Sequence, residues 1–146
     1  MIHSLEHVAL SVSDMERSLQ FYRDFIGMEV VFEVDFDDER IGRITGMPGA
    51  KCKVVHLRLG DGTLELFQYL DPVGKRIPQK RLQCDQGFTH IGLKVTDIHR
   101  HVQELKERGI ELLGELIEVR PNAWVVYFRG PDGEVCEYRQ VPEKLP

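Results

Sequence analysis

The chain has 146 residues, of which 42% are hydrophobic and 29% are charged, which is typical of a soluble globular domain. Its net charge of −5 argues against a nucleic-acid partner, because phosphate binding needs a basic face. No apolar run approaches the roughly 20 residues that span a bilayer, and the start MIHSLEHV lacks the features of a signal peptide. Three cysteines without a C-x-x-C pair indicate neither a disulfide framework nor a zinc ribbon. We therefore expect a cytoplasmic protein with no nucleic-acid or membrane partner.

The first half of the chain predicts a strand, a helix and three further strands. Residues 7–13 alternate between apolar and more polar side chains, which indicates a half-buried strand. Asp14 suits a helix N-cap, residues 15–26 carry apolar side chains at helical spacing, and Gly27 suits the left-handed position that ends a helix. Residues 28–36 predict a second strand. Two more apolar segments surround the hairpin motif GDG.

Two polar stretches separate these elements. The stretch DDERIGRITGMPGAKCK is interpreted as a flexible, solvated loop. Alternatively, its basic side chains could grip an anionic substrate; they are Arg40, Arg43, Lys51 and Lys53. Residues 71–86 are polar and contain two prolines, and they predict a linker.

The second half repeats the order of the first. An alternating segment over 90–95 leads to Asp97 as a helix cap, a helical pattern over 98–108 and a terminating Gly109. Residues 110–119 are again typical of a strand, and two apolar segments surround the motif GPDG. In both halves the opening histidine precedes the capping aspartate by seven residues.

The repeat predicts the fold class. We expect an α+β protein, one domain over 1–146 built from two tandem βαβββ modules at about 1–70 and 87–146. A single four-stranded unit leaves one face of its sheet uncovered by its helix, so two units can bring those faces together and form a cleft.

Four titratable residues occupy equivalent places in the two modules: His7 and Glu65 in the first, His90 and Glu137 in the second. Their apolar strand neighbours should pack against the helices, so these side chains should point to the opposite face, and His56 could line the cleft beside them. A carboxylate within a strand is costly to bury without a partner. A shared cation satisfies two imidazoles and two carboxylates most simply, which predicts a metal-binding cleft.

The motifs HVALSVSDMERSLQFYRDFIGMEV, GDGTLELF, THIGLKVTD and GPDGEVCEYRQ resemble the vicinal oxygen chelate superfamily. This superfamily includes glyoxalase I, methylmalonyl-CoA epimerase, extradiol dioxygenases and bleomycin-resistance proteins. The resemblance extends from His7 to about Val141. It implies paired βαβββ modules around one divalent ion, with ligands at His7, Glu65, His90 and Glu137. Ni, Zn, Co or Mn is expected, or Fe in a dioxygenase.

The ligand set is similar to that of bacterial glyoxalase I. This resemblance implies a metal-dependent lyase or isomerase of the glyoxalase I and epimerase type, acting on a small substrate with vicinal oxygens. Family dioxygenases use two His and one Glu, which His7, His90 and Glu137 match, and the added Glu65 would fill a position that oxygen chemistry needs open. An Fe(II)-dependent ring-cleaving dioxygenase and a non-catalytic resistance protein stay as alternatives. Ser11 replaces the Arg typical of glutathione-dependent glyoxalase I, which argues against glutathione.

The expected chemistry is proton transfer next to a carbonyl, with the metal stabilising the enolate. Glu137 is the expected base, since a carboxylate that loosens from the metal is close and weakly basic, and Glu65 is the alternative. Open sheet edges predict a homodimer, in agreement with the resemblance. Four aromatic residues are interpreted either as pocket walls or as ordinary core: Phe67, Tyr69, Trp124 and Tyr127.

Overall fold

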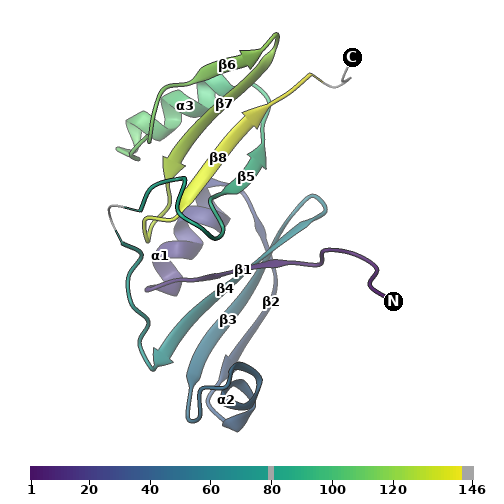
Figure 1. The fold of residues 1–146 in the computed structure, drawn as a ribbon, viewed down its shortest axis with the longest axis vertical. Helices are drawn as coiled ribbons and strands as arrows, with labels where there is room; N and C mark the ends of the chain where they lie inside the picture. Colours follow the sequence, from purple (N-terminus) through teal and green to yellow (C-terminus); the bar gives the residue numbers. More distant parts are fainter. Residues whose placement is uncertain (79–80, 143–146) are drawn as a thin grey trace. The chain divides into compact units, whose positions relative to one another are not determined.

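A computed structural model describes residues 1–78 and 81–142. The chain divides into two compact units, Met1–Arg76 and Ile77–Pro146, and each unit contains one four-stranded sheet (Figure 1). None of the helices in the described part of the chain is long and apolar enough to cross a membrane.

Unit 1 has a mixed sheet in the strand order β1-β4-β3-β2. β1 is parallel to β4, whereas the β4–β3 and β3–β2 pairs are antiparallel. The elements in chain order are β1 (Val8–Ser11), α1 (Met15–Leu19), the π-helix η1 (Gln20–Phe25), β2 (Glu29–Phe36), α2 (Glu39–Thr45), β3 (Lys51–Leu59) and β4 (Gly62–Asp71).

Unit 2 repeats this topology with the order β5-β8-β7-β6. β5 is parallel to β8, and the other pairs are antiparallel. Its elements are β5 (Ile91–Lys94), α3 (Ile98–Glu107), β6 (Ile117–Arg120), β7 (Ala123–Arg129) and β8 (Val135–Gln140). The α+β fold class and the two tandem βαβββ modules are therefore confirmed.

The helix that follows the first strand begins and ends in unit 1 as the sequence predicts. Asp14 is the N-cap and accepts a hydrogen bond from the Arg17 backbone N–H at 3.0 Å. The Met15 N–H donates to the side-chain oxygen of Gln68 on β4 at 3.1 Å. Gly27 adopts a positive φ of 90° after the helical segment, a conformation that favours glycine.

Unit 2 begins its helix differently. Asp97 occupies the N-cap position of α3 but lies in the left-handed region, with φ 54°, and its side chain makes no capping hydrogen bond. The prediction of a carboxylate cap at Asp97 is therefore wrong. The Ile98 N–H instead donates to Gln140 on β8 at 2.9 Å. In both units a glutamine on the last strand thus accepts the first N–H of the helix.

The stretch interpreted as a flexible loop contains α2, so that interpretation is wrong. Asp38 caps this helix by accepting from the Arg40 N–H at 2.9 Å, and Gly46 ends it with φ 70°. Ile41 is 3% exposed and packs with Cys52 and Val54 of β3. Apolar periodicity is weak here because the short helix buries little besides Ile41, so only the two caps signalled it.

The two faces of the unit 1 sheet carry different side chains. Gln68 comes three residues after Glu65 on β4, so the two side chains point to opposite faces of the sheet. Because Gln68 contacts the start of α1, this helix lies on the face opposite to Glu65. The Glu65 face also holds His56, which pairs with Glu65 across β3 and β4. α2 covers the other end of this face, through a cluster with partly buried neighbours that include Phe67 and Tyr69. The Glu65 face is therefore polar at one end and apolar at the other.

Candidate functional site

Glu65 lies between two imidazoles in unit 1. Its Oε2 is 3.1 Å from His7 Nε2, and its Oε1 is 2.5 Å from His56 Nε2. The sheet register produces this arrangement, because Ala9 of β1 and His56 of β3 both pair with Glu65, and His7 has the same parity as Ala9. The Glu65 side chain is only 12% exposed. The structure thus brings His7 and Glu65 together and adds His56 to them.

The other nitrogen of His7 is also engaged. Its Nδ1 donates a hydrogen bond to the Glu6 carboxylate. This bond is the main cause that raises the pKa of His7 above its usual value of 6.5, and the Glu65 charge adds to it. A neutral imidazole that donates from Nδ1 has only a lone pair at Nε2. Facing a carboxylate oxygen, that lone pair needs a proton or a metal ion between the two groups.

Unit 2 contains the equivalent pair. His90 Nε2 lies 3.6 Å from Glu137 Oε2, and His90 Nδ1 lies 2.9 Å from Thr89 Oγ1. As in unit 1, the residue before the histidine makes a hydrogen bond with Nδ1, and Nε2 faces the carboxylate. The Glu137 side chain is 13% exposed, so both carboxylates are largely shielded from water.

The surroundings of Glu137 differ from those of Glu65. Tyr127 of β7 pairs with Glu137, in the place that His56 takes in unit 1. Burial raises the pKa of Tyr127, and the charge of Glu137 and a hydrogen bond to it raise that pKa further. Gly92 of β5 pairs with Glu137, and a Cβ there would lie 3.1 Å from Glu137 Oε2. The glycine therefore leaves space beside the carboxylate.

The donor spacing within each pair fits a shared divalent ion. Two ligands at about 2.1 Å from one ion lie about 3.0–3.4 Å apart in octahedral or tetrahedral geometry. The spacing of 3.1 Å in unit 1 falls in this range, and the 3.6 Å in unit 2 is slightly wider. Within the described residues of either unit, no three His, Cys, Asp or Glu side chains converge to hold a metal. The His–carboxylate pair of one unit offers two candidate donors, fewer than the four of a zinc site.

The basic side chains of α2 make contacts with their own helix. Arg40 Nε lies 2.7 Å from Asp38 Oδ2, and Arg43 Nη1 lies 3.7 Å from Glu39 Oε1. Arg40 also lies over the Phe36 ring. These contacts favour the solvated interpretation of both arginines over a grip on an anionic substrate.

The aromatic residues divide between the two interpretations. Phe67 and Tyr69 stack at 5.9 Å and pack against the α2 cluster, as core residues do. Trp124 lies edge-on to His99 of α3, which places it on the helix side of the unit 2 sheet. Tyr127 lies 5.0 Å from the His90 ring. Of the four aromatic residues, Tyr127 is the one that borders a His–carboxylate pair.

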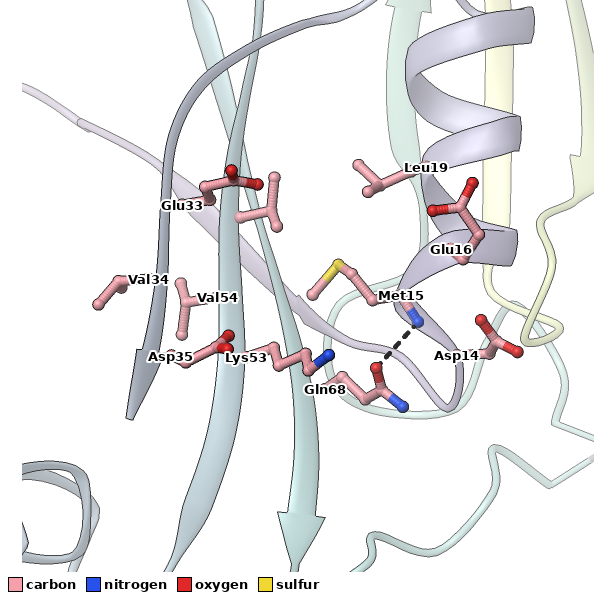
Figure 2. Close-up of a pocket in the computed structure, with 11 residues that line it drawn as sticks. Asp14, Met15, Glu16, Leu19, Glu33, Val34, Asp35, Lys53, Val54 and Gln68 are labelled. Atoms are coloured by element: carbon pink, nitrogen blue, oxygen red, sulfur yellow. Dashed lines mark hydrogen bonds between the residues drawn. The ribbon is translucent and has the colours of Figure 1, made fainter. Parts of the chain in front are cut away.

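A pocket of about 660 Å³ lies on the face of the unit 1 sheet that is opposite to Glu65. Figure 2 shows it between the start of α1 and strands β2 and β3, beside the hydrogen bond from Met15 to Gln68. Carboxylates and one lysine supply its charged groups: Asp14, Glu16, Glu33, Asp35 and Lys53. Its described lining contains no imidazole, so this pocket includes neither of the His–carboxylate pairs.

Sequence reasoning placed His56 only as a polar residue of the cleft and missed its contact with Glu65. A signal was available. The two-residue turn at Gly60 and Asp61 starts the β3–β4 pairing at Leu59 and Gly62, and counting outward brings His56 opposite Glu65. The loop between β7 and β8 is longer, so the sequence does not show that pairing starts at Arg129 and Val135, from which the same count brings Tyr127 opposite Glu137.

Curated proteins that are similar to this chain include two epimerases. It is 31% identical to a 2-epi-5-epi-valiolone epimerase from Actinomyces sp, over 98% of this chain and 82% of that protein. It is 30% identical to a mitochondrial methylmalonyl-CoA epimerase from Bos taurus, over 87% of this chain and 66% of that protein. The chain thus spans about two thirds of the length of the methylmalonyl-CoA epimerase.

Solved structures match the fold over nearly the whole chain. A glyoxalase family protein from Bacillus cereus has a TM-score of 0.88 and 21% identity, covering 96% of this chain and 95% of that one. The fosfomycin resistance protein FosX from Listeria monocytogenes, in complex with Mn(II) and sulfate, has a TM-score of 0.64 and 15% identity, covering 98% and 96%.

The family follows from a model match over most of the chain. The model described as Glyoxalase/Bleomycin resistance protein/Dioxygenase superfamily matches residues 4–138. This range contains all four candidate ligands and every helix and strand of both modules except the last two residues of β8. The chain therefore belongs to the glyoxalase/bleomycin resistance protein/dioxygenase superfamily, as its motifs predict.

Proposed function

We propose that the protein is a divalent-metal-dependent isomerase or lyase of the epimerase and glyoxalase I type. It would move a proton at a carbon next to a carbonyl, in a small substrate with two neighbouring oxygens. The observation that carries this proposal is the repeated pair, in which an imidazole Nε2 faces a shielded carboxylate in each unit. Two epimerases at 30–31% identity favour the isomerase.

The proposed ligands are His7, Glu65, His90 and Glu137, two from each unit, on a single ion. Three features support this set: the donor spacing within each pair, the engaged Nδ1 of both histidines, and the family relationship. Two nitrogens and two oxygens suit Mn, Co, Ni or Zn, and the related FosX is in complex with Mn(II).

A divalent ion bound there would supply Lewis acidity that stabilises negative charge on a substrate oxygen. The proton would be carried by Glu137. This carboxylate has one imidazole at 3.6 Å and a hydrogen bond with Tyr127, and it faces Gly92, where space is available. Glu65 has an imidazole at each of its oxygens. A carboxylate must move between the substrate carbon and its resting position to act as base and acid, so the less constrained Glu137 suits the role better.

Deuterium exchange tests the proposal directly. The protein is loaded separately with Mn, Co, Ni or Zn and incubated in deuterated water. The compounds tested are simple hydroxyketones, 2-epi-5-epi-valiolone and methylmalonyl-CoA, the last two taken from the names of the relatives. Mass spectrometry should detect deuterium uptake at a carbon next to a carbonyl. Oxygen consumption with Fe(II) and a catechol, without such uptake, would favour the dioxygenase instead. Small-molecule binding without any metal would favour the resistance protein.

Matched variants assign the proton carrier. Glu137→Gln should lower the exchange rate at saturating metal by at least about 100-fold, because an amide oxygen can bind metal but has no useful basicity. Glu65→Gln should lower it less. Glu107→Gln, on the exposed face of α3, is the control and should leave the rate unchanged. A larger loss in Glu65→Gln than in Glu137→Gln would reverse the two roles.

We also propose a homodimer. Each sheet has two outer strands, and β6 is exposed along its whole length, with Ile117 at 50% and Val119 at 61% exposure. Open edges with apolar side chains are usually paired or covered. Light scattering at micromolar concentration should give twice the chain mass of 16.9 kDa. A monomer mass would contradict the proposal.

A further inference from the structure

His56 is a polar residue that is not among the proposed metal ligands. It lies on β3, directly across from Glu65, and its Nε2 is 2.5 Å from Glu65 Oε1. A carboxylate accepts hydrogen bonds, so Nε2–H of His56 is the donor. The ring is held by an edge-on contact with Phe32 of β2, at 5.2 Å between centroids. Register and packing therefore both place this donor at the carboxylate.

We propose that His56 is a positioning residue that restricts Glu65 to binding the metal through one oxygen, Oε2. This inference rests on the proposed function, because it concerns one of the proposed ligands. The His56 contact engages Oε1 and leaves Oε2 toward His7 Nε2 at 3.1 Å. A glutamate side chain otherwise has several rotatable bonds, and a fixed second contact reduces the freedom that is lost on metal binding.

His56 itself does not fit as a second nitrogen ligand beside His7. The carboxylate lies between the two imidazoles, and their ring centroids are 6.3 Å apart. His56 Nε2 also approaches Oε1, whereas His7 Nε2 approaches Oε2. His56 therefore acts through Glu65 and not on the metal.

Unit 2 provides the internal comparison. The residue across from Glu137 is Tyr127, and the one imidazole near Glu137 lies at 3.6 Å. Glu65 instead has imidazole nitrogens at 3.1 and 2.5 Å, one at each oxygen, so its two contacts are closer than the His90 contact of Glu137. This difference would make one carboxylate a fixed ligand and leave the other able to move.

Metal affinity in matched variants tests the inference. Metal dissociation constants are measured by competition with a chromophoric chelator for His56→Ala, His56→Gln and Arg58→Gln. Arg58 lies two residues along β3, on the same face, and makes an exposed ion pair with Glu29 at 3.0 Å, so it is the control. Loss of a hydrogen-bonding partner of a metal ligand typically weakens affinity 10–100-fold. His56→Ala should therefore bind at least about 10-fold more weakly than the wild type.

His56→Gln should restore affinity to within about threefold of the wild type, because its amide N–H can still donate to Oε1. Arg58→Gln should bind as the wild type does. The visible spectrum of the Co(II) protein should change in His56→Ala and stay unchanged in Arg58→Gln. Wild-type affinity in His56→Ala would overturn the inference, and so would equal losses in His56→Ala and His56→Gln.

A measurement on the metal-free protein separates this inference from the proposed function. The ¹³C resonance of the Glu65 carboxyl should shift in His56→Ala and keep nearly its wild-type position in His56→Gln. A wild-type protein that binds no divalent metal would overturn the proposed function. An unshifted Glu65 resonance in His56→Ala would overturn the His56 inference, whatever the metal result.

Discussion

The two units share one topology but hold their carboxylates in different ways. Glu65 lies between two imidazoles, with one at each oxygen. Glu137 has one imidazole at 3.6 Å, a tyrosine across the strand and a glycine beside it. A duplicated scaffold thus places two identical side chains at equivalent positions and surrounds them with different partners across the strand.

A second difference lies at the end of the sheet away from Glu65. In unit 1, α2 packs on the face that carries Glu65 and covers an apolar cluster there. Between β6 and β7 of unit 2 only two residues connect the strands, so no helix occupies the matching place. The two units therefore differ on the sheet face that carries the carboxylate. On the opposite face, Gln68 and Gln140 make the same contact to a helix N-terminus in both units.

The largest effect that we expect is the pH dependence of metal binding through His7. The pKa of His7 is raised above 6.5, first by the hydrogen bond to Glu6 and then by Glu65. A proton at Nε2 competes with the metal, so affinity should be full above this raised pKa and fall by up to about tenfold per pH unit below it. In the metal-free protein, the pH dependence of the folding stability has the opposite sign to that of the metal affinity. The stability from the raised pKa is present below pH 6.5 and is lost as pH rises through the folded-state pKa.

Glu6→Gln isolates this effect. Removing the Glu6 charge should lower the pKa of His7 and move the loss of metal to lower pH. The His7 ring proton, followed by NMR against pH, reports the pKa, and chelator competition reports the affinity. Glu16→Gln, on the exposed side of α1, is the control. An unchanged pH profile in Glu6→Gln would contradict the role assigned to this hydrogen bond.

Gly92→Ala tests whether the space beside Glu137 matters. The added methyl would lie 3.1 Å from Glu137 Oε2 and should restrict the movement of this carboxylate. We expect proton exchange to fall about fivefold with little change in metal affinity, since each 1 kcal/mol added to the barrier lowers a rate about fivefold. The reciprocal variant, Ala9→Gly beside Glu65, should leave exchange within about twofold. Equal effects of the two variants would remove the asymmetry between the units.

The smallest expected effect concerns the helix anchors. Gln140→Ala removes the side-chain acceptor of the first α3 N–H, where Asp97 makes no cap, and should lower stability by about 1 kcal/mol. Gln68→Ala should cost about half of that, because Asp14 still caps α1. Urea denaturation measures both values. A larger loss in Gln68→Ala would contradict this account of the caps.

Much of the fold could be predicted because two signals recur in the sequence. Strand alternation placed His7 and Glu65 on one face, and the structure brings them to 3.1 Å. Capping residues marked the helix ends, although the left-handed Asp97 shows that a residue type alone does not determine its conformation. α2 was missed because it buries little besides Ile41. The role of His56 depends on cross-strand register, which an apolar pattern does not encode.

The stoichiometry of bound metal tests the central claim most directly. The claim is that the pair His7–Glu65 and the pair His90–Glu137 together hold one divalent ion. Elemental analysis of the metal-loaded, dialysed protein should give one ion per chain, and either His7→Ala or His90→Ala should abolish most of it, because each variant removes one of four ligands. Two ions per chain, or one ion that persists in both variants, would show that the pairs do not share a metal and would contradict the account.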